Sequence, residues 1–196
     1  MADVAGVILG AGLSRRLGRP KQTLPLGDTT LLGWVVREAE ASSLDPLVVV
    51  TTVEVETGRA TVTQPSGRDP SCSASSLCSG LDAVGAPDAV MLLVGDMPGV
   101  DAALVDAVRA EWEAGRPWAL VTEYDDARGH PLVFSADALP DLRAARGEKV
   151  AWRLLESEPG RVAAARVRRP LPRDVDTWED YEAVRAELTP PPAPGG

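Results

Sequence analysis

The stretch VAGVILGAG, residues 4–12, decides the fold of this chain. Its first six residues form an apolar run and its glycines mark a sharp turn, which predicts a buried strand that ends in a loop. A second apolar run, Ala89–Val94, ends in the same way at Gly95-Asp96. Strands that are apolar throughout are typical of parallel sheets with both faces covered. Ligands of such sheets lie outside the carboxyl ends of the strands.

Strand-like and helix-like segments alternate along the rest of the chain. This predicts an α/β fold, a single Rossmann-like domain of three layers with a mostly parallel sheet, over residues 1–188. We expect strands at residues 4–9, 47–53, 60–63, 89–94, 118–122, 131–134 and 162–167. We expect helices at residues 29–41, 73–84, 101–112, 136–145, 150–156 and 178–188. The Pro/Gly-rich tail, residues 189–196, has too few large apolar side chains to order and is expected to be disordered.

Composition excludes several classes of protein. The 196 residues carry a net charge of −9, which argues against binding to nucleic acid. No apolar run approaches the length of a membrane span, and the N-terminus does not resemble a signal peptide, so we expect a cytoplasmic protein. Two cysteines and one histidine are too few for a Cys/His zinc site, and a disulfide scaffold is not expected at this size.

The loop after the first strand concentrates positive charge in an acidic protein. Arg15, Arg16, Arg19 and Lys21 lie within seven residues, Ser14 adds a hydroxyl donor, and glycines let backbone N–H groups approach an anion. This pattern favours a polyphosphate site. It lacks the third glycine of the dinucleotide fingerprint and the Gly-Lys-Ser/Thr of the ATPase loop. The alternative interpretation is a surface turn with solvated arginines.

A carboxylate follows the second apolar strand. Asp96, in Gly-Asp-Met-Pro, is expected at the same sheet edge as the glycine loop, where one or two carboxylates with phosphate oxygens would hold Mg²⁺. The alternative is an ordinary Asp-Pro turn. Asp174 and Asp176 precede the last expected helix, and either could complete the metal site, with Asp174 preferred. Thr177 is expected to cap that helix.

Together these segments resemble the MobA/MocA-like nucleotidyltransferases. Residues 9–25, Leu-Gly-Ala-Gly-x-Ser-Arg-Arg-Leu-Gly-Arg-Pro-Lys-x-x-Leu-Pro, resemble the family's opening signature, and the Arg-Pro-Lys ending resembles its molybdenum cofactor cytidylyltransferase branch. Gly10 stands where alanine is commoner. Gly95–Pro98 resembles the family's metal-binding motif. Residues 174–180 resemble its Asp-Ile-Asp-Thr-Pro-Glu-Asp segment, with Trp178 in place of proline.

Weaker resemblances concern three other segments. Residues 72–77, Cys-Ser-Ala-Ser-Ser-Leu, resemble a nucleotide-contact segment, although plain helix capping by serine is the alternative. Residues 128–134 resemble the acceptor-side segment Gly-His/Asn-Pro-Val-Leu-Phe, in which a catalytic proton transfer by His130 is not expected because asparagine also occurs there. Residues 147–155 match Gly-Asp-Lys-Gly-x-Arg-x-Leu-Leu poorly, which leaves the acceptor open.

The resemblance implies a nucleotide-diphospho-sugar transferase type of fold and assigns roles. Catalysis is expected from Arg15, Lys21 and Asp96. Nucleotide contacts are expected from Leu9, Gly10, Ala11, Gly12, Ser14, Arg15, Lys21, Ser73 and Ser75. Acceptor contacts are expected from His130 and Pro131, and Mg²⁺ ligands from Asp96 and Asp174. The implied substrates are CTP and molybdopterin, and the implied client is a molybdenum hydroxylase of the xanthine dehydrogenase type.

Three alternatives remain open. Transfer could start from GTP or end on another phosphorylated acceptor, such as a sugar phosphate or phospholactate. Proteins described as nicotine blue oxidoreductases resemble the same family, so an NAD(P)H-dependent oxidoreductase is a second possibility. A nucleotide-binding partner protein without turnover is the third.

Overall fold

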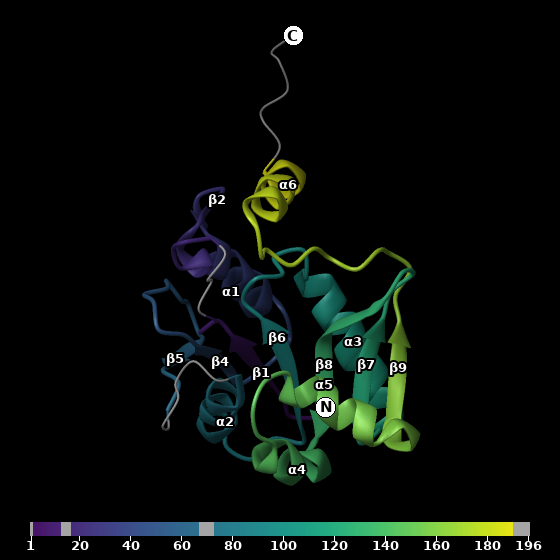
Figure 1. Cartoon of the computed structure of the whole chain (residues 1–196). Coiled ribbons are helices and arrows are strands. Elements are labelled where there is room, and N and C mark those ends of the chain that lie inside the picture. Colours follow the sequence, from purple (N-terminus) through teal and green to yellow (C-terminus); the bar gives the residue numbers. More distant parts are fainter. Residues whose placement is uncertain (1, 13–16, 67–72, 190–196) are drawn as a thin grey trace.

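The computed structural model describes residues 2–12, 17–66 and 73–189 of the chain. Seven strands form one sheet in the order β5-β4-β1-β6-β8-β7-β9 (Figure 1). They are β1 (Val4–Leu9), β4 (Leu47–Val50), β5 (Thr61–Thr63), β6 (Ala89–Val94), β7 (Ala119–Glu123), β8 (Arg128–Ser135) and β9 (Val162–Arg166). All of the strands expected from the sequence occur. The pairing is parallel except at β8, which runs antiparallel to both β6 and β7. The sheet is therefore mostly parallel, as predicted.

The helices also lie where the sequence places them. They are α1 (Leu31–Ala41), α2 (Ser73–Ala83), α3 (Ala102–Gly115), α4 (Leu139–Ala144), α5 (Val150–Ser157) and α6 (Trp178–Leu188). Short 3-10 turns are η1 (Lys21–Thr23), η2 (Ala136–Ala138) and η3 (Pro159–Arg161). The segment expected to be one helix over residues 136–145 is split into η2 and α4. None of the helices in the described ranges is long and apolar enough to cross a membrane.

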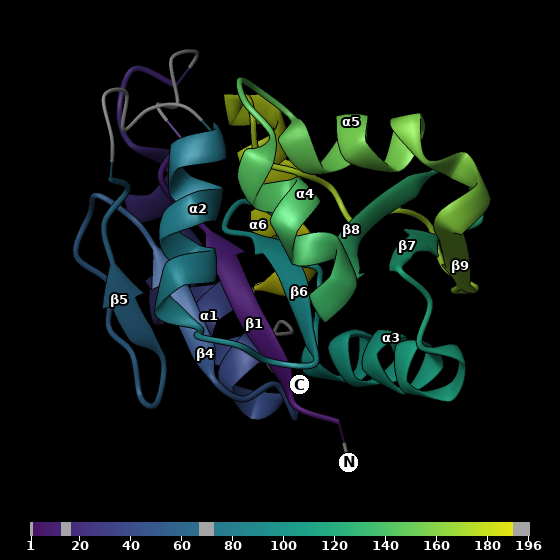
Figure 2. The same cartoon turned by 90° about the horizontal axis from the view of Figure 1, so that it is seen from below.

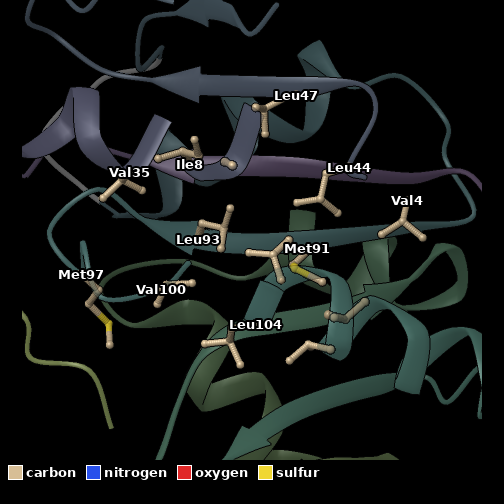
Figure 3. Packing of buried hydrophobic residues seen from close by; sticks show 14 of the residues in the cluster. Val4, Ile8, Val35, Leu44, Leu47, Met91, Leu93, Met97, Val100 and Leu104 are labelled. Carbon is tan, nitrogen blue, oxygen red and sulfur yellow. The ribbon is translucent and has the colours of Figure 1, made fainter. Parts of the chain in front are cut away.

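Two apolar layers cover the sheet because successive side chains of its strands point to opposite faces. Val4 and Ile8 of β1 pack with α1 and α3, whereas Ala5 and Val7 pack with α2, α4 and α5. Figure 2 shows these two sets of helices on opposite sides of the sheet, and Figure 3 shows the first layer at close range.

A third apolar cluster anchors α6. A small hairpin that the sequence did not predict, β2 (Pro25–Leu26) with β3 (Thr29–Thr30), contributes Leu26, which packs with Tyr181 and Val184 of the helix. The Tyr181 hydroxyl donates to the Pro25 carbonyl at 2.6 Å. This packing holds the C-terminal part of the chain close to the loop that follows β1.

Polar caps determine where the helices begin. Thr177 Oγ1 accepts from the Asp180 N–H and Asp180 accepts from the Thr177 N–H, a capping box that confirms the predicted cap of α6. Asp101, the first residue of the helix expected at 101–112, caps α3 by accepting from the Leu104 N–H at 2.8 Å. At the other end of α6, the Thr189 N–H bonds to the Arg185 carbonyl, so Thr189 belongs to the helix end rather than to the expected tail. Residues 190–196 lie outside the described ranges.

Candidate active site at the carboxyl edge of β1 and β6

Two glycines let the ends of β1 and β6 approach each other closely. A Cβ atom on Gly95 would lie 3.1 Å from the Gly10 Cα and 2.7 Å from a Leu32 methyl group. The Gly10 N–H donates to the Val50 carbonyl at 2.8 Å. The Gly10 amide is therefore paired within the sheet, and the nucleotide contact expected of Gly10 stays a prediction.

The described part of the glycine loop is supported by a residue that sequence reasoning missed. Buried Gln22 donates from Nε2 to the Gly12 carbonyl at 2.8 Å. Leu9 lines the cavity described below, Ala11 is buried and Gly12 is exposed. Ser14 and Arg15, both predicted to bind the nucleotide, lie outside the described residues.

Lys21 lies at the centre of the site. It is 8% exposed, and its Nζ lies 2.6 Å from Asp96 Oδ2 and 2.8 Å from Asp176 Oδ1. Burial alone would lower the pKa of Lys21, but the charge of Asp96 and the hydrogen bonds to Asp176 and Asp96 outweigh burial and raise the pKa. Lys21 is therefore an ammonium ion at neutral pH.

Asp96 is held between this cation and two further carboxylates. Burial raises the pKa of Asp96, the charge and hydrogen bond of Lys21 oppose that rise, and the negative charges of Asp174 and Asp176 add to it. The buried Val175 N–H donates to the Asp96 carbonyl at 2.9 Å, which fixes the strap (residues 167–177, between β9 and α6) against the end of β6. The strap thus brings Asp174 and Asp176, the two residues that flank Val175 in the sequence, to the site.

The two carboxylates of the strap have different surroundings. Asp176 accepts from Lys21, whereas Asp174 lines the same cavity as Asp96. Among the residues that the structure describes, no group of three or more His, Cys, Asp or Glu side chains is arranged to hold a metal. Two carboxylate donors still fit Mg²⁺, because this ion keeps several waters and takes phosphate oxygens as ligands.

A cavity of about 660 Å³ opens beside these carboxylates. Its lining joins the ends of β1 and β6 to the start of β8, α2, α5 and the strap. It includes Leu9, Asp96, Asp174, Ser73, Arg128, His130, Lys149, Trp152, Leu171 and Pro172. The lining combines apolar side chains with charged ones.

The two residues predicted to contact the acceptor are placed differently. His130 lines the cavity and burial lowers its pKa to about 4, so its imidazole is neutral at physiological pH. Pro131 is buried in β8 and does not line the cavity, and its carbonyl accepts from Thr122 Oγ1 at 2.7 Å. Pro131 thus lies within the strand, and its contact with the acceptor stays a prediction.

The two serines predicted to contact the nucleotide also differ. Ser73 Oγ donates to the Gly147 carbonyl and accepts from the Lys149 N–H, both at 3.1 Å. Ser73 therefore connects the start of α2 to the loop before α5. Its two partners lie 74 and 76 positions further along the chain, so no local sequence pattern reveals these contacts. Ser75 is half-buried one turn before Ser79, whose hydroxyl donates to the Ser75 carbonyl.

Two relatives are similar to most of this chain in sequence. The purine catabolism protein PucB of Bacillus subtilis is 28% identical over 94% of this chain and 97% of its own length. A probable molybdenum cofactor guanylyltransferase of Opitutus terrae is 30% identical over 74% of each chain.

Solved structures share the whole fold. The homologue of Mycobacterium tuberculosis Rv0371c from Mycobacterium sp. strain JC1 is 38% identical, with a TM-score of 0.85 over 95% of this chain and 96% of that one. Rv0371c of M. tuberculosis in complex with manganese is 30% identical, with a TM-score of 0.77 over 93% and 97% of the two chains. Nucleotidyltransferases of this kind use divalent metals. The model of the MobA-like NTP transferase domain matches residues 6–164, and the chain belongs to this family of nucleotidyltransferases.

Proposed function

We propose that this protein is a Mg²⁺-dependent cytidylyltransferase that moves CMP from CTP to the phosphate of molybdopterin and releases pyrophosphate. The observation that carries the proposal is the buried Lys21 ammonium between Asp96 and Asp176, at the sheet edge where the cationic loop begins. Arg19-Pro20-Lys21 supports the cytidylyl branch by resemblance. The name of PucB, which refers to purine catabolism, is compatible with a molybdenum hydroxylase of the xanthine dehydrogenase type as the client.

The reaction needs positioning and charge neutralisation rather than a strong base. An oxygen of the acceptor phosphate forms a bond to the α-phosphorus of CTP, the bond from that phosphorus to the bridging oxygen of the β-phosphate breaks, and pyrophosphate leaves. A phosphate monoester is already anionic near pH 7, so the neutral His130 need not take a proton. Lys21 would neutralise negative charge on the triphosphate, as the compact point charge of a lysine suits a phosphate.

Asp96 and Asp174 are the residues that would hold Mg²⁺. Both line the cavity, and Asp174 raises the pKa of Asp96 through its negative charge, which makes a cation between them favourable. When bound, Mg²⁺ would act as a Lewis acid on the phosphate oxygens. A metal on Asp96 would compete with Lys21, whose Nζ lies 2.6 Å from Asp96 Oδ2.

The relative from Opitutus terrae favours GTP as the alternative donor. Calorimetric titration with CTP, GTP, ATP and NADH, each with and without Mg²⁺, separates the donors. We expect selective CTP binding that depends on Mg²⁺, followed by pyrophosphate release only when molybdopterin is added. Selective GTP binding would replace the cytidylyl assignment with a guanylyl one. Binding of NADH without any response to a nucleoside triphosphate would refute nucleotidyl transfer.

A further inference from the structure

We infer that Trp178 is a positioning residue of the nucleotide site. Its indole ring holds Arg19, and the guanidinium of Arg19 serves beside Lys21 as a second cation for the triphosphate of the substrate. The inference rests on the proposed function, because that function supplies the triphosphate. It goes beyond the proposed function by giving a role to the first residue of α6, which lies outside the cavity next to Asp96.

Two contacts join the loop after β1 to the start of α6. Lys21 Nζ lies 2.8 Å from Asp176 Oδ1, and the Cζ atom of Arg19 lies 5.8 Å from the centre of the Trp178 ring. Arg19 is two residues before Lys21, and Trp178 is two residues after Asp176, so the two segments pass each other in opposite directions. The same short segment at the start of α6 therefore holds both cations.

The charges of these two cations are compensated to different degrees. Lys21 lies between the carboxylates of Asp96 and Asp176. Arg19 is exposed, and in the described ranges of the chain no carboxylate pairs with it. A contact with an aromatic face cancels no charge, so the N–H donors of this guanidinium stay available to a phosphate. Since several cations commonly neutralise a reacting phosphate chain, Arg19 can add the charge that Lys21 shares with two carboxylates.

Neither the core nor the start of α6 requires an indole at position 178. Trp178 is 47% exposed, so most of the stability of the α6 packing comes from other residues, such as the buried Tyr181 and Val184. Trp178 is the first helical residue after the cap Thr177, whose backbone is extended at φ −127° and ψ 168°. Even proline would fit after a residue in this conformation. The contact with Arg19 is therefore the particular contribution of the ring.

The indole is held in place before a nucleotide binds. The rings of Trp178 and Tyr181 meet edge to face, with centroids 5.8 Å apart and planes at 79°. Tyr181 is fixed in turn, because its hydroxyl donates to the Pro25 carbonyl of β2 at 2.6 Å. Figure 1 shows α6 beyond the end of the sheet, near β2. An arginine that is held in advance loses less side-chain entropy when it binds an anion.

Binding of inorganic tripolyphosphate tests the two residues without a base or a metal. Calorimetric titration of the full chain in the absence of Mg²⁺ leaves the phosphates to the cations of the protein. We expect Arg19→Gln to weaken binding about tenfold, the loss typical of a charge-assisted hydrogen bond. Trp178→Ala should weaken it about threefold, as the loss of a cation–π contact at an exposed site predicts, whereas Trp178→Phe keeps a ring and should weaken it less than about twofold.

The matched control is a second exposed arginine that contacts a tryptophan. The Cζ atom of Arg116 lies 5.9 Å from the centre of the Trp112 ring, and Arg116 precedes β7, at the opposite edge of the sheet. Arg116→Gln removes the same charge and should leave the affinity for tripolyphosphate unchanged. Trp178→Pro is a second variant without the ring and should behave like Trp178→Ala, because the first helical position accepts proline.

The double variant separates positioning from general support of the fold. If Trp178 acts through Arg19, then Trp178→Ala should cause no further loss of affinity when Arg19→Gln is already present. Equal losses from Trp178→Ala in both backgrounds would overturn the positioning role. Unchanged affinity in Arg19→Gln, or no binding of tripolyphosphate by the unchanged protein, would overturn the whole inference.

Turnover of CTP with Mg²⁺ distinguishes this inference from the proposed function. In Arg19→Gln the KM for CTP should rise about tenfold while kcat stays within about twofold, because the contact is already made in the bound ground state. An unchanged KM would overturn the inference. The expected losses of tripolyphosphate affinity, without turnover of any nucleoside triphosphate by the unchanged protein, would overturn the proposed function alone.

Discussion

Lys21 Nζ lies 2.6 Å from Asp96 Oδ2, so the cation of the loop after β1 and the carboxylate at the end of β6 form one partly buried ion pair. The ion pair connects the expected phosphate site to the expected metal site. It also means that a metal ion on Asp96 competes with an ammonium group that is already there. The first two predictions follow from this relationship.

Removal of the Asp96 charge should abolish turnover without unfolding the protein. Asp96→Asn keeps the shape of the side chain but weakens the metal site and removes one of the negative charges beside Lys21. We expect kcat for pyrophosphate release to fall at least about 10²-fold, which is typical when charge stabilisation at a reacting phosphate is lost. Asp137→Asn, at an exposed position in η2, is the matched control and should retain full activity. Full activity of Asp96→Asn would exclude its catalytic role.

Removal of the Lys21 charge should make the protein more dependent on metal. Lys21→Met leaves Asp96 near Asp174 and Asp176 without its cation, so we expect a loss of about 1–3 kcal/mol in unfolding free energy without metal. Since the competing ammonium is absent, Mg²⁺ should raise the melting temperature of this variant more than that of the unchanged protein.

Lys149→Met is the control for the metal experiment, because it removes the chain's other lysine. Thermal unfolding at several Mg²⁺ concentrations measures the effect. Equal metal-induced shifts for Lys21→Met and the unchanged protein would show that Lys21 and the metal do not share a site.

Ser73 should act on the loop before α5 rather than on the nucleotide directly. Its hydroxyl holds Gly147 and Lys149, and Lys149 has the left-handed backbone angle φ of +52° that side chains rarely adopt. In Ser73→Ala the exchange of the Lys149 amide hydrogen with solvent should accelerate about tenfold, which corresponds to the net free energy of one ordinary hydrogen bond. Ser75→Ala should leave this exchange unchanged. An unchanged rate in Ser73→Ala would contradict this role of the Ser73 hydroxyl.

His130 should give stability a pH dependence. Its pKa is about 4 in the folded protein against 6.5 in the unfolded chain, so between these values only the unfolded chain binds the proton. Stability should therefore be complete above pH 6.5 and fall as the pH drops toward 4, by at most about 1.4 kcal/mol per pH unit.

The free energy of unfolding in urea is measured between pH 5 and 7.5 for the unchanged protein and for His130→Asn. The difference between the two pH curves isolates the contribution of His130, because the contribution of the carboxylates is common to both and cancels. The imidazole NMR signal gives a direct reading because the chain has one histidine. A midpoint near 6.5 in the folded protein would contradict the burial argument.

Local patterns determined most of the fold. The apolar runs at β1 and β6, the helical spacing of α1 and the cap at Thr177 act over a few residues, so the sequence alone predicts them. Asp96 was predictable for the same reason, because a carboxylate directly after a buried strand must lie at the carboxyl edge of the sheet. The antiparallel direction of β8 was not predictable from its composition, since a buried strand is apolar in either direction.

Only the tertiary structure decided which distant groups meet. Lys21 pairs with Asp176 across 155 positions because the strap crosses the end of β6, and that crossing depends on the packing of α6 against the β2–β3 hairpin. The same crossing gives Asp174 and Asp176 different surroundings, although their sequence contexts are nearly alike. Likewise, it is the contact with His130 in the folded chain that distinguishes Trp152 from the other four tryptophans. Sequence determined the kinds of residue at the sheet edge, whereas long-range packing determined their partners.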